Sequence, residues 1–265
     1  MYEKYWGLSQ KPFLNTPDPR FLYHSAQHDE ALSRLIYAVQ ERIGAAMLTG
    51  AFGCGKTVIA QALLKELSAQ KYKTAYIFNP RLDDIDLLRM IAHHLGIIQP
   101  PTRKTDVLNI LQDALLNNMR NGKEAVIIID EAHAINDDNI FEEIRLLLNF
   151  QLEDRFLLTL FLLGQPELKE KVDQNIQLEQ RINIKCHLGS LTKEDTKNYI
   201  IHRLAVAGRN EPAFTEEAIG AIFDYSGGIP RRINRLCDIC LLAGFMKQVD
   251  KVGDEIVREE IKGFD

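Results

Sequence analysis

Hydrophobic residues recur in two alternating patterns along the first 190 positions of the chain. Short, nearly continuous apolar runs alternate with stretches in which apolar side chains return every three or four residues. The first pattern is typical of strands and the second of helices that bury one side; residues 125–129, a nearly pure β-branched run, have the pattern of a strand buried on both faces. The expected strands are 45–49, 74–78, 125–129, 156–163 and 182–187, and the expected helices are 28–41, 56–69, 85–95, 107–119 and 140–152. This alternation predicts an α/β fold with a parallel sheet flanked by helices.

Beyond residue 190 the pattern is helical only, with expected helices at 192–207, 215–224, 229–246 and 255–262. Thr192 is followed three positions later by Asp195, which is the spacing of a capping box at a helix start. Thr215 begins the next helical segment in the same way, and the acidic residues after it favour the helix N-terminus. We therefore expect a nucleotide-binding α/β core over residues 1–190 and a small all-helical lid domain over residues 191–265.

Composition narrows the class of protein only slightly. Hydrophobic residues make up 46% of the chain and charged residues 26%, which is ordinary for a globular protein. The longest apolar run, 156–163, is far shorter than the roughly 18 residues of a membrane helix. We expect no membrane insertion by this chain and a cytoplasmic location, either free or at the inner face of the membrane. The net charge of −5 disfavours a broad nucleic-acid-binding face, although Arg231, Arg232 and Arg235 could form a local basic patch.

Two of the four cysteines, Cys237 and Cys240, have the CxxC spacing of half a zinc site or of a redox pair. They lie in a helical pattern, and no second Cys or His pair is nearby in the sequence. Buried helix cysteines are therefore the favoured interpretation.

Residues 50–57 match the phosphate-binding pattern GxxxxGK[ST] in full. Glycines let consecutive backbone N–H groups point at phosphate oxygens, and the helix that follows directs its positive end at the same anion. In this pattern the lysine reaches the β- and γ-phosphates and the hydroxyl ligates Mg²⁺. The sequence predicts ATP and Mg²⁺ as cofactors, bound by Gly50, Ala51, Phe52, Gly53, Cys54, Gly55, Lys56, Thr57 and Val58, with Thr57 as a metal ligand.

A second motif, Asp130-Glu131, directly follows the expected strand 125–129, which is the most apolar of the expected strands. At the carboxyl end of a strand, Asp130 would hold Mg²⁺ and Glu131 would orient the attacking water. Together with Ala132 and His133 these residues also spell the DEAH motif of helicases. Because no further helicase motif is present, His133 is interpreted as a local structural residue.

The order of these features resembles that of AAA+ P-loop ATPases. Further short motifs extend over nearly all 265 residues: Tyr5-Trp6-Gly7-Leu8, Pro12-Phe13, the stretch 17–23, His28, Glu30-Ala31, Leu163-Gly164-Gln165-Pro166-Glu167-Leu168, Gln180-Arg181-Ile182, and the stretches 199–204 and 227–234. These motifs resemble those of the ExeA/GspA family of secretion and pilus ATPases, including its short MshM-like members. TniB/TnsC-type transposition ATPases share many of the same motifs.

The resemblance implies further roles for individual residues. Gln165 would be the polar sensor near the lytic water, although AAA+ proteins often carry Asn there. Arg181 would be an arginine finger that reaches the site of a neighbouring subunit. Arg231 would be the lid sensor that touches the γ-phosphate, with Arg232 as the alternative. The segment 12–23 would line the adenine pocket.

The implied function is ATP hydrolysis at the subunit interfaces of a ring-like homo-oligomer. It would drive assembly or remodelling of a bacterial type II secretion or type IV pilus machine, with secretion or pilus assembly proteins as partners. A DNA-associated ATPase that regulates transposition is the alternative. A switch that binds ATP without hydrolysing it is disfavoured by the presence of Glu131 and Arg181. Full ExeA-like proteins continue into a membrane helix and a peptidoglycan-binding domain, so a short member and a truncated chain both fit.

Overall fold

A computed structural model describes residues 1–264 of the chain, and these residues form two compact units. Unit 1 combines Met1–His28, Gly53–Val58 and the described residues from Gly189 onward. Unit 2 combines Asp29–Phe52 and Ile59–Leu188. The division therefore runs through the loop that carries the phosphate-binding pattern.

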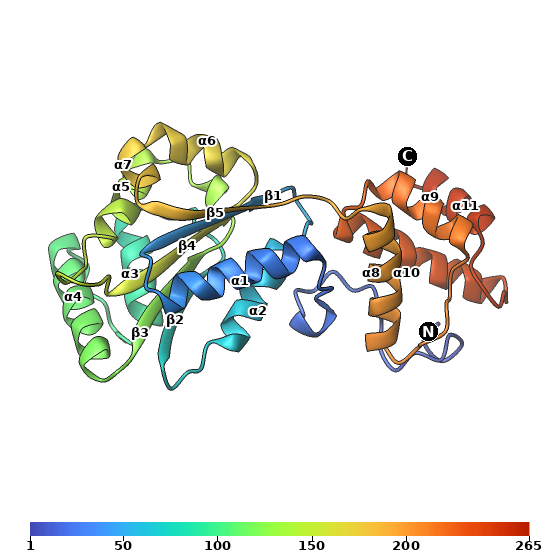
Figure 1. The fold of residues 1–265 in the computed structure, drawn as a ribbon, viewed down its shortest axis with the longest axis horizontal. Coiled ribbons are helices and arrows are strands. Elements are labelled where there is room, and N and C mark those ends of the chain that lie inside the picture. The colour runs from blue at the N-terminus through green and yellow to red at the C-terminus, as the bar shows by residue number, and fades with distance from the viewer. Residues whose placement is uncertain (265) are drawn as a thin grey trace. The chain divides into compact units, whose positions relative to one another are not determined.

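Unit 2 is built on a five-stranded sheet whose strands are all parallel (Figure 1). Its strands lie in the order β2-β3-β4-β1-β5. They are β1 (Ala45–Gly50), β2 (Tyr72–Ile77), β3 (Glu124–Ile129), β4 (Leu158–Gly164) and β5 (Ile182–Leu188). The sheet and its flanking helices confirm the predicted fold class. Because the strands are parallel, the residues that follow β1, β3 and β4 emerge at one edge of the sheet.

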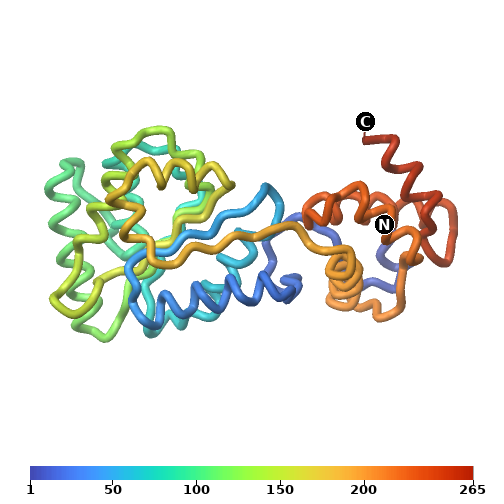
Figure 2. Tube along the Cα trace, turned by 45° about the horizontal axis from the view of Figure 1, so that its top comes forward, coloured from blue at the N-terminus to red at the C-terminus, as the bar shows by residue number. Residues whose placement is uncertain are grey.

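Helices cover both faces of this sheet. Helices α1 (Ala26–Gln40) and α2 (Lys56–Glu66) lie together along one face in both views (Figures 1 and 2). On the other face, alternate strand residues such as Ile127, Ile129 and Leu160 form a core with buried side chains of the remaining helices. Those helices are α3 (Asp84–His94), α4 (Lys104–Arg120), α5 (Asp138–Leu147), α6 (Glu167–Gln174) and α7 (Ile176–Glu179), with the 3-10 turn η2 (Ala132–Ala134) after β3.

Unit 1 contains α8 (Lys193–Val206), α9 (Glu216–Ser226), α10 (Pro230–Met246) and α11 (Asp254–Lys262). The expected caps are present: Thr192 Oγ1 accepts from the backbone N–H of Asp195 at 3.0 Å, and Thr215 Oγ1 accepts from that of Ala218 at 3.2 Å. Cys237 and Cys240 lie fully buried on α10 in the hydrophobic core. This agrees with their interpretation as buried cysteines of a helix.

The N-terminal segment belongs to the same unit and runs among these helices (Figure 2). It is irregular apart from the 3-10 turn η1 (Pro19–Phe21). Trp6 is 1% exposed, and its indole N–H donates to the carbonyl of Leu241 at 2.8 Å. Tyr2 and Phe13 are buried in the same core. Compact units of this kind need not be the segments that fold on their own. The expected domain boundary at residue 190 therefore stays a prediction.

None of the helices within residues 1–264 combines the length and the apolar character that a membrane crossing requires.

Candidate functional site

The predicted phosphate-binding loop lies between β1, which ends at Gly50, and α2, which begins at Lys56. Gly53 and Gly55 have φ values of +86° and +105°, a region that side chains with a Cβ rarely adopt. Gly50 is required for a different reason, because a Cβ there would lie 2.7 Å from the backbone oxygen of Leu188. Gly53 and Gly55 thus serve the backbone conformation of the loop, and Gly50 serves the close approach of β5.

Two groups of unit 1 contact the loop directly. Nε2 of His28 lies 3.0 Å from the carbonyl oxygen of Cys54, and its Nδ1 lies 2.7 Å from Oγ of Ser25. Because a carbonyl can only accept, Nε2 carries the hydrogen and Nδ1 accepts from the serine hydroxyl. The backbone N–H of Arg231 donates to the carbonyl of Gly53 at 3.3 Å. The structure thus places the predicted lid residue Arg231 against the loop, and it adds His28, for which no role was predicted.

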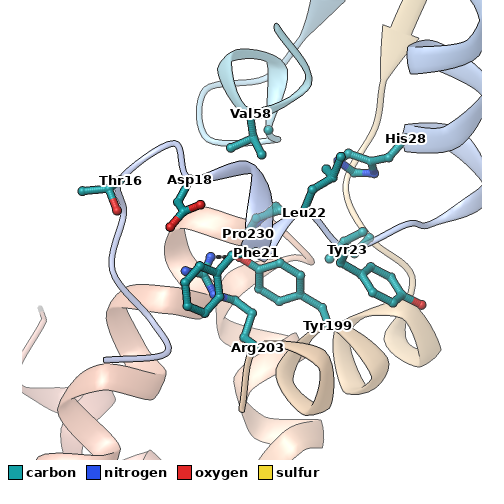
Figure 3. Close-up of a pocket in the computed structure, with 12 residues that line it drawn as sticks. Thr16, Asp18, Phe21, Leu22, Tyr23, His28, Val58, Tyr199, Arg203 and Pro230 are labelled. Atoms are coloured by element: carbon teal, nitrogen blue, oxygen red, sulfur yellow. Dashed lines mark hydrogen bonds between the residues drawn. The ribbon is translucent and has the colours of Figure 1, made fainter. Parts of the chain in front are cut away.

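A pocket opens beside the loop within unit 1 (Figure 3). It has an aromatic and apolar wall with a few polar groups, which is the usual lining of a small-molecule site. Its lining residues are Thr16, Asp18, Phe21, Leu22, Tyr23, His28, Gly55, Val58, Leu191, Tyr199, Arg203 and Pro230. The segment 12–23, expected to line an adenine pocket, therefore shares this pocket with Gly55 and Val58.

Arg203 of α8 organises the pocket wall. The side chain is 5% exposed, and its guanidinium lies 4.7 Å from the centre of the Phe21 ring (Figure 3). It donates to the carbonyl oxygens of Pro12 and Leu14 at 2.5 and 2.9 Å, and to the Tyr199 hydroxyl at 2.8 Å. A buried arginine needs such partners, and here they tie the irregular N-terminal segment to α8. The sequence offered only a weak signal for this role, namely Tyr199 one helical turn before Arg203.

At the carboxyl end of β3, Asp130 is 2% exposed and its carboxylate is oriented by two donors. Oδ1 accepts from the backbone N–H of Glu131 at 2.8 Å, and Oδ2 accepts from the Tyr76 hydroxyl at 2.7 Å. Burial, followed by the charge of Asp130, raises the pKa of Tyr76, so this hydroxyl stays protonated and donates. Mg²⁺ binds one or two carboxylates together with phosphate oxygens and water. The Asp130 carboxylate, held in place by its two hydrogen bonds, has the chemistry of such a ligand.

Three side chains meet beyond the ends of β3 and β4. Nε2 of His133, in η2, lies 3.5 Å from a carboxylate oxygen of Glu131 and 2.8 Å from the side-chain amide of Gln165. The backbone N–H of Gln165 also donates to Nδ1 of His133 at 3.3 Å. The predicted catalytic residues Glu131 and Gln165 are thus brought together, with His133 between them.

Arg181 lies elsewhere in unit 2. Its backbone N–H donates to the carbonyl of Leu178 in α7, and β5 begins at the next residue. In the β1–β5 register Ala45 pairs with Ile182, whereas Gly50 pairs with Leu188. Arg181 therefore lies at the edge of the sheet opposite to the edge from which Glu131 and Gln165 emerge.

A parallel sheet with this strand order, a phosphate-binding loop after β1 and an Asp-Glu pair after β3 define a P-loop ATPase of the AAA+ class. The sequence model of the AAA domain family matches residues 39–172, about half of the chain. The chain belongs to this AAA domain family.

Two curated proteins have sequences similar to this chain. General secretion pathway protein A of Aeromonas hydrophila is 38% identical over 255 residues, which cover 95% of this chain and 46% of that protein. An uncharacterized HTH-type transcriptional regulator of Methanocaldococcus jannaschii is 28% identical over 151 residues, which cover 55% of this chain and 36% of that protein. The chain thus spans less than half the length of these curated relatives.

Solved structures show the same fold at low sequence identity. The ORC2 protein of Aeropyrum pernix superimposes with a TM-score of 0.74 at 18% identity, covering 96% of this chain and 71% of that one. The RuvB branch migration motor of Thermotoga maritima gives a TM-score of 0.58 at 20% identity, covering 90% of this chain and 69% of that one.

Proposed function

We propose that the chain binds ATP with Mg²⁺ through residues 50–58 and hydrolyses it. The observation that carries the proposal is the loop itself, with its left-handed glycines and the adjoining pocket lined by Phe21, Tyr199 and Arg203. Lys56 would bind the β- and γ-phosphates, Glu131 would orient the attacking water, and Gln165 and Arg231 would sense the γ-phosphate. Bound to Thr57 and Asp130, Mg²⁺ would neutralise charge on the phosphate oxygens.

We further propose that hydrolysis requires a second copy of the chain. The sheet register supports this, since Arg181 precedes the first residue of β5 while the loop begins beside the last. A strand rises about 3.3 Å per residue, so these ends are on the order of 20 Å apart. An arginine side chain is too short to span that distance. If Arg181 acts on a γ-phosphate, it does so at the site of a neighbour in a ring-like homo-oligomer.

The cellular role that we propose is assembly or remodelling of a bacterial envelope machine of the type II secretion or type IV pilus kind. The similarity to general secretion pathway protein A over 95% of this chain supports it. Partners would be further copies of this chain and secretion or pilus assembly proteins, at the cytoplasmic face of the inner membrane. The overall negative charge gives less support to a DNA-associated role in transposition.

Steady-state ATP hydrolysis over a range of protein concentrations, with and without duplex DNA, tests these proposals. Glu131→Gln serves as the blank. We expect specific activity to rise with protein concentration, because assembly completes the site, and to be unaffected by DNA. Strong stimulation by DNA would favour the transposition role over the envelope role. Equal rates in the wild-type protein and the blank would contradict the proposed hydrolysis.

A further inference from the structure

The contact between Glu131, His133 and Gln165 joins two proposed catalytic residues through a third residue of a different kind. We propose that His133 is a positioning residue whose Nε2 hydrogen attracts the Glu131 carboxylate, 3.5 Å away, and couples it to Gln165. This inference rests on the proposed function, because it concerns the orientation of the residue that would prepare the attacking water.

The backbone around His133 is held from two sides. The ammonium group of Lys171 in α6 donates to the carbonyl oxygens of His133 and Ile135 at 2.7 and 2.5 Å. Gly164, at the end of β4, approaches so closely that a Cβ there would lie 3.1 Å from the backbone nitrogen of His133 and 2.9 Å from Leu168. The turn η2 is therefore fixed against β4 and α6, and this fixed backbone limits the positions that the His133 imidazole can take.

The hydrogen bonds determine which ring nitrogen carries the hydrogen. The backbone N–H of Gln165 can only donate, so Nδ1 of His133 must accept from it. In the neutral imidazole the hydrogen is then on Nε2. Two acceptors lie near this N–H, the carboxylate of Glu131 and the side-chain amide of Gln165, which can turn its oxygen toward the ring.

This arrangement matters because the Glu131 side chain is more exposed than the ring beside it. Its backbone has φ +55°, and its side chain is 38% exposed, whereas that of His133 is only 17% exposed. An exposed carboxylate samples several rotamers, and a donor on a fixed ring favours one of them. Because the same ring contacts both the backbone and the amide of Gln165, a shift of Gln165 at a bound nucleotide would change the position of Glu131.

Two substitutions at position 133 separate this role from a purely structural one. In His133→Asn, Oδ1 can still accept from the Gln165 N–H, but no donor reaches Glu131. In His133→Gln, the longer side chain places an amide N–H where Nε2 was. We expect His133→Asn to lower kcat by about ten- to a hundredfold with an unchanged ATP dissociation constant and unchanged thermal unfolding. His133→Gln should recover most of the loss, and His93→Asn, at an exposed histidine of α3, is the matched control.

The ring itself provides a readout that does not depend on hydrolysis. Nitrogen-15 NMR of the nucleotide-free protein should show His133 with hydrogen on Nε2 and an unprotonated Nδ1, and Glu131→Gln should shift the Nε2 signal. The proposal is overturned by hydrogen on Nδ1, by an unchanged kcat in His133→Asn, or by equal losses in both variants. Weaker nucleotide binding in proportion to the loss of rate would also overturn it. If Glu131→Gln itself hydrolyses ATP normally, the proposed function fails instead, and the tautomer of His133 still reports on the contact.

Discussion

The hydroxyl of Tyr76 on β2 donates a 2.7 Å hydrogen bond to Oδ2 of Asp130, the residue that follows β3. The neighbouring strand thereby fixes the carboxylate proposed to bind Mg²⁺. Outer partners of this kind orient a metal ligand and typically influence metal affinity. Asp130 is also held through its backbone N–H, which donates to the carbonyl of Ile77 at 2.8 Å.

Tyr76→Phe should therefore raise the Mg²⁺ concentration needed for half-maximal ATP hydrolysis by about tenfold, because Oδ2 of Asp130 loses the hydrogen bond from the tyrosine. A magnesium titration at saturating ATP measures this shift. Tyr72→Phe, near the other end of the same strand, is the matched control and should leave the titration unchanged. An unaltered magnesium requirement in Tyr76→Phe would mean that the hydroxyl does not prepare Asp130 for the metal.

The sequence predicted β1, β3 and β4 well because each is a largely apolar run, whereas β2 and β5 mix apolar and polar residues. The confirmed strand β3, for example, follows from Val126, Ile127 and Ile128 alone. Helices α6 and α7 were not predicted, because they are short and α6 is mostly polar. Their presence became visible only with the burial of Leu168, Val172 and Leu178 against the sheet.

The residues of the candidate site likewise fall into those that the sequence could predict and those that it could not. The loop and the Asp-Glu pair are contiguous in the sequence, and their spacing carries the chemistry. Tyr76, His133 and Arg203 contact residues that are distant along the chain, so no local pattern distinguishes them from ordinary strand, turn or helix residues. The packing of Trp6 into the core of unit 1 was unpredictable for a similar reason, since the irregular N-terminal segment has no periodicity.

Gly53→Ala should weaken ATP binding without unfolding the protein. The added Cβ would lie 2.6 Å from Cβ of Arg231, and the backbone would keep a φ of +86°, which is strained for alanine. Such strain costs about 1–3 kcal/mol, which corresponds to roughly a ten- to hundredfold loss of affinity if the loop must adopt this shape to bind. Titration with a fluorescent ATP analogue measures the change.

Gly220→Ala is the control for this substitution. Gly220 lies within α9, where the nearest atom to a new Cβ is the ammonium nitrogen of Lys193 at 3.8 Å. This variant should bind nucleotide normally and gain about 0.5–1 kcal/mol of stability from the alanine. Equal affinities in both variants would show that the observed loop shape is not needed for binding.

Arg181→Ala should abolish most hydrolysis while leaving nucleotide affinity unchanged, because an arginine finger contributes about 10³–10⁵ in rate. Glu131→Gln should be equally inactive. In an equimolar mixture of the two variants, some interfaces combine an intact Glu131 with an intact Arg181 from the neighbour. Random assembly of a cyclic ring makes this about a quarter of all interfaces, so the mixture should regain about a quarter of wild-type activity.

The double variant Arg181→Ala/Glu131→Gln has no such complementary interface with either single variant and is the control for the mixture. Recovery with the double variant would point to contamination rather than complementation. If the mixture of single variants stays inactive, or if Arg181→Ala alone hydrolyses ATP normally, Arg181 does not act across an interface.

His202 of α8 should make unit 1 less stable in mildly acidic solution. Burial, followed by the charges of His24 and Arg203, lowers the pKa of His202, and its ring also packs beside that of Tyr23. The unfolded chain takes up a proton at the ordinary value of about 6.5, whereas the folded chain resists until lower pH. The stabilising contribution is therefore complete above about pH 6.5 and is lost as the pH falls toward the folded-state pKa.

Trp6 is the single tryptophan of the chain, so its fluorescence reports urea unfolding of this unit. The urea midpoint should fall between about pH 7.5 and pH 5.5 in the wild-type protein and fall less in His202→Gln. Equal pH dependence in both proteins would assign the effect to other groups.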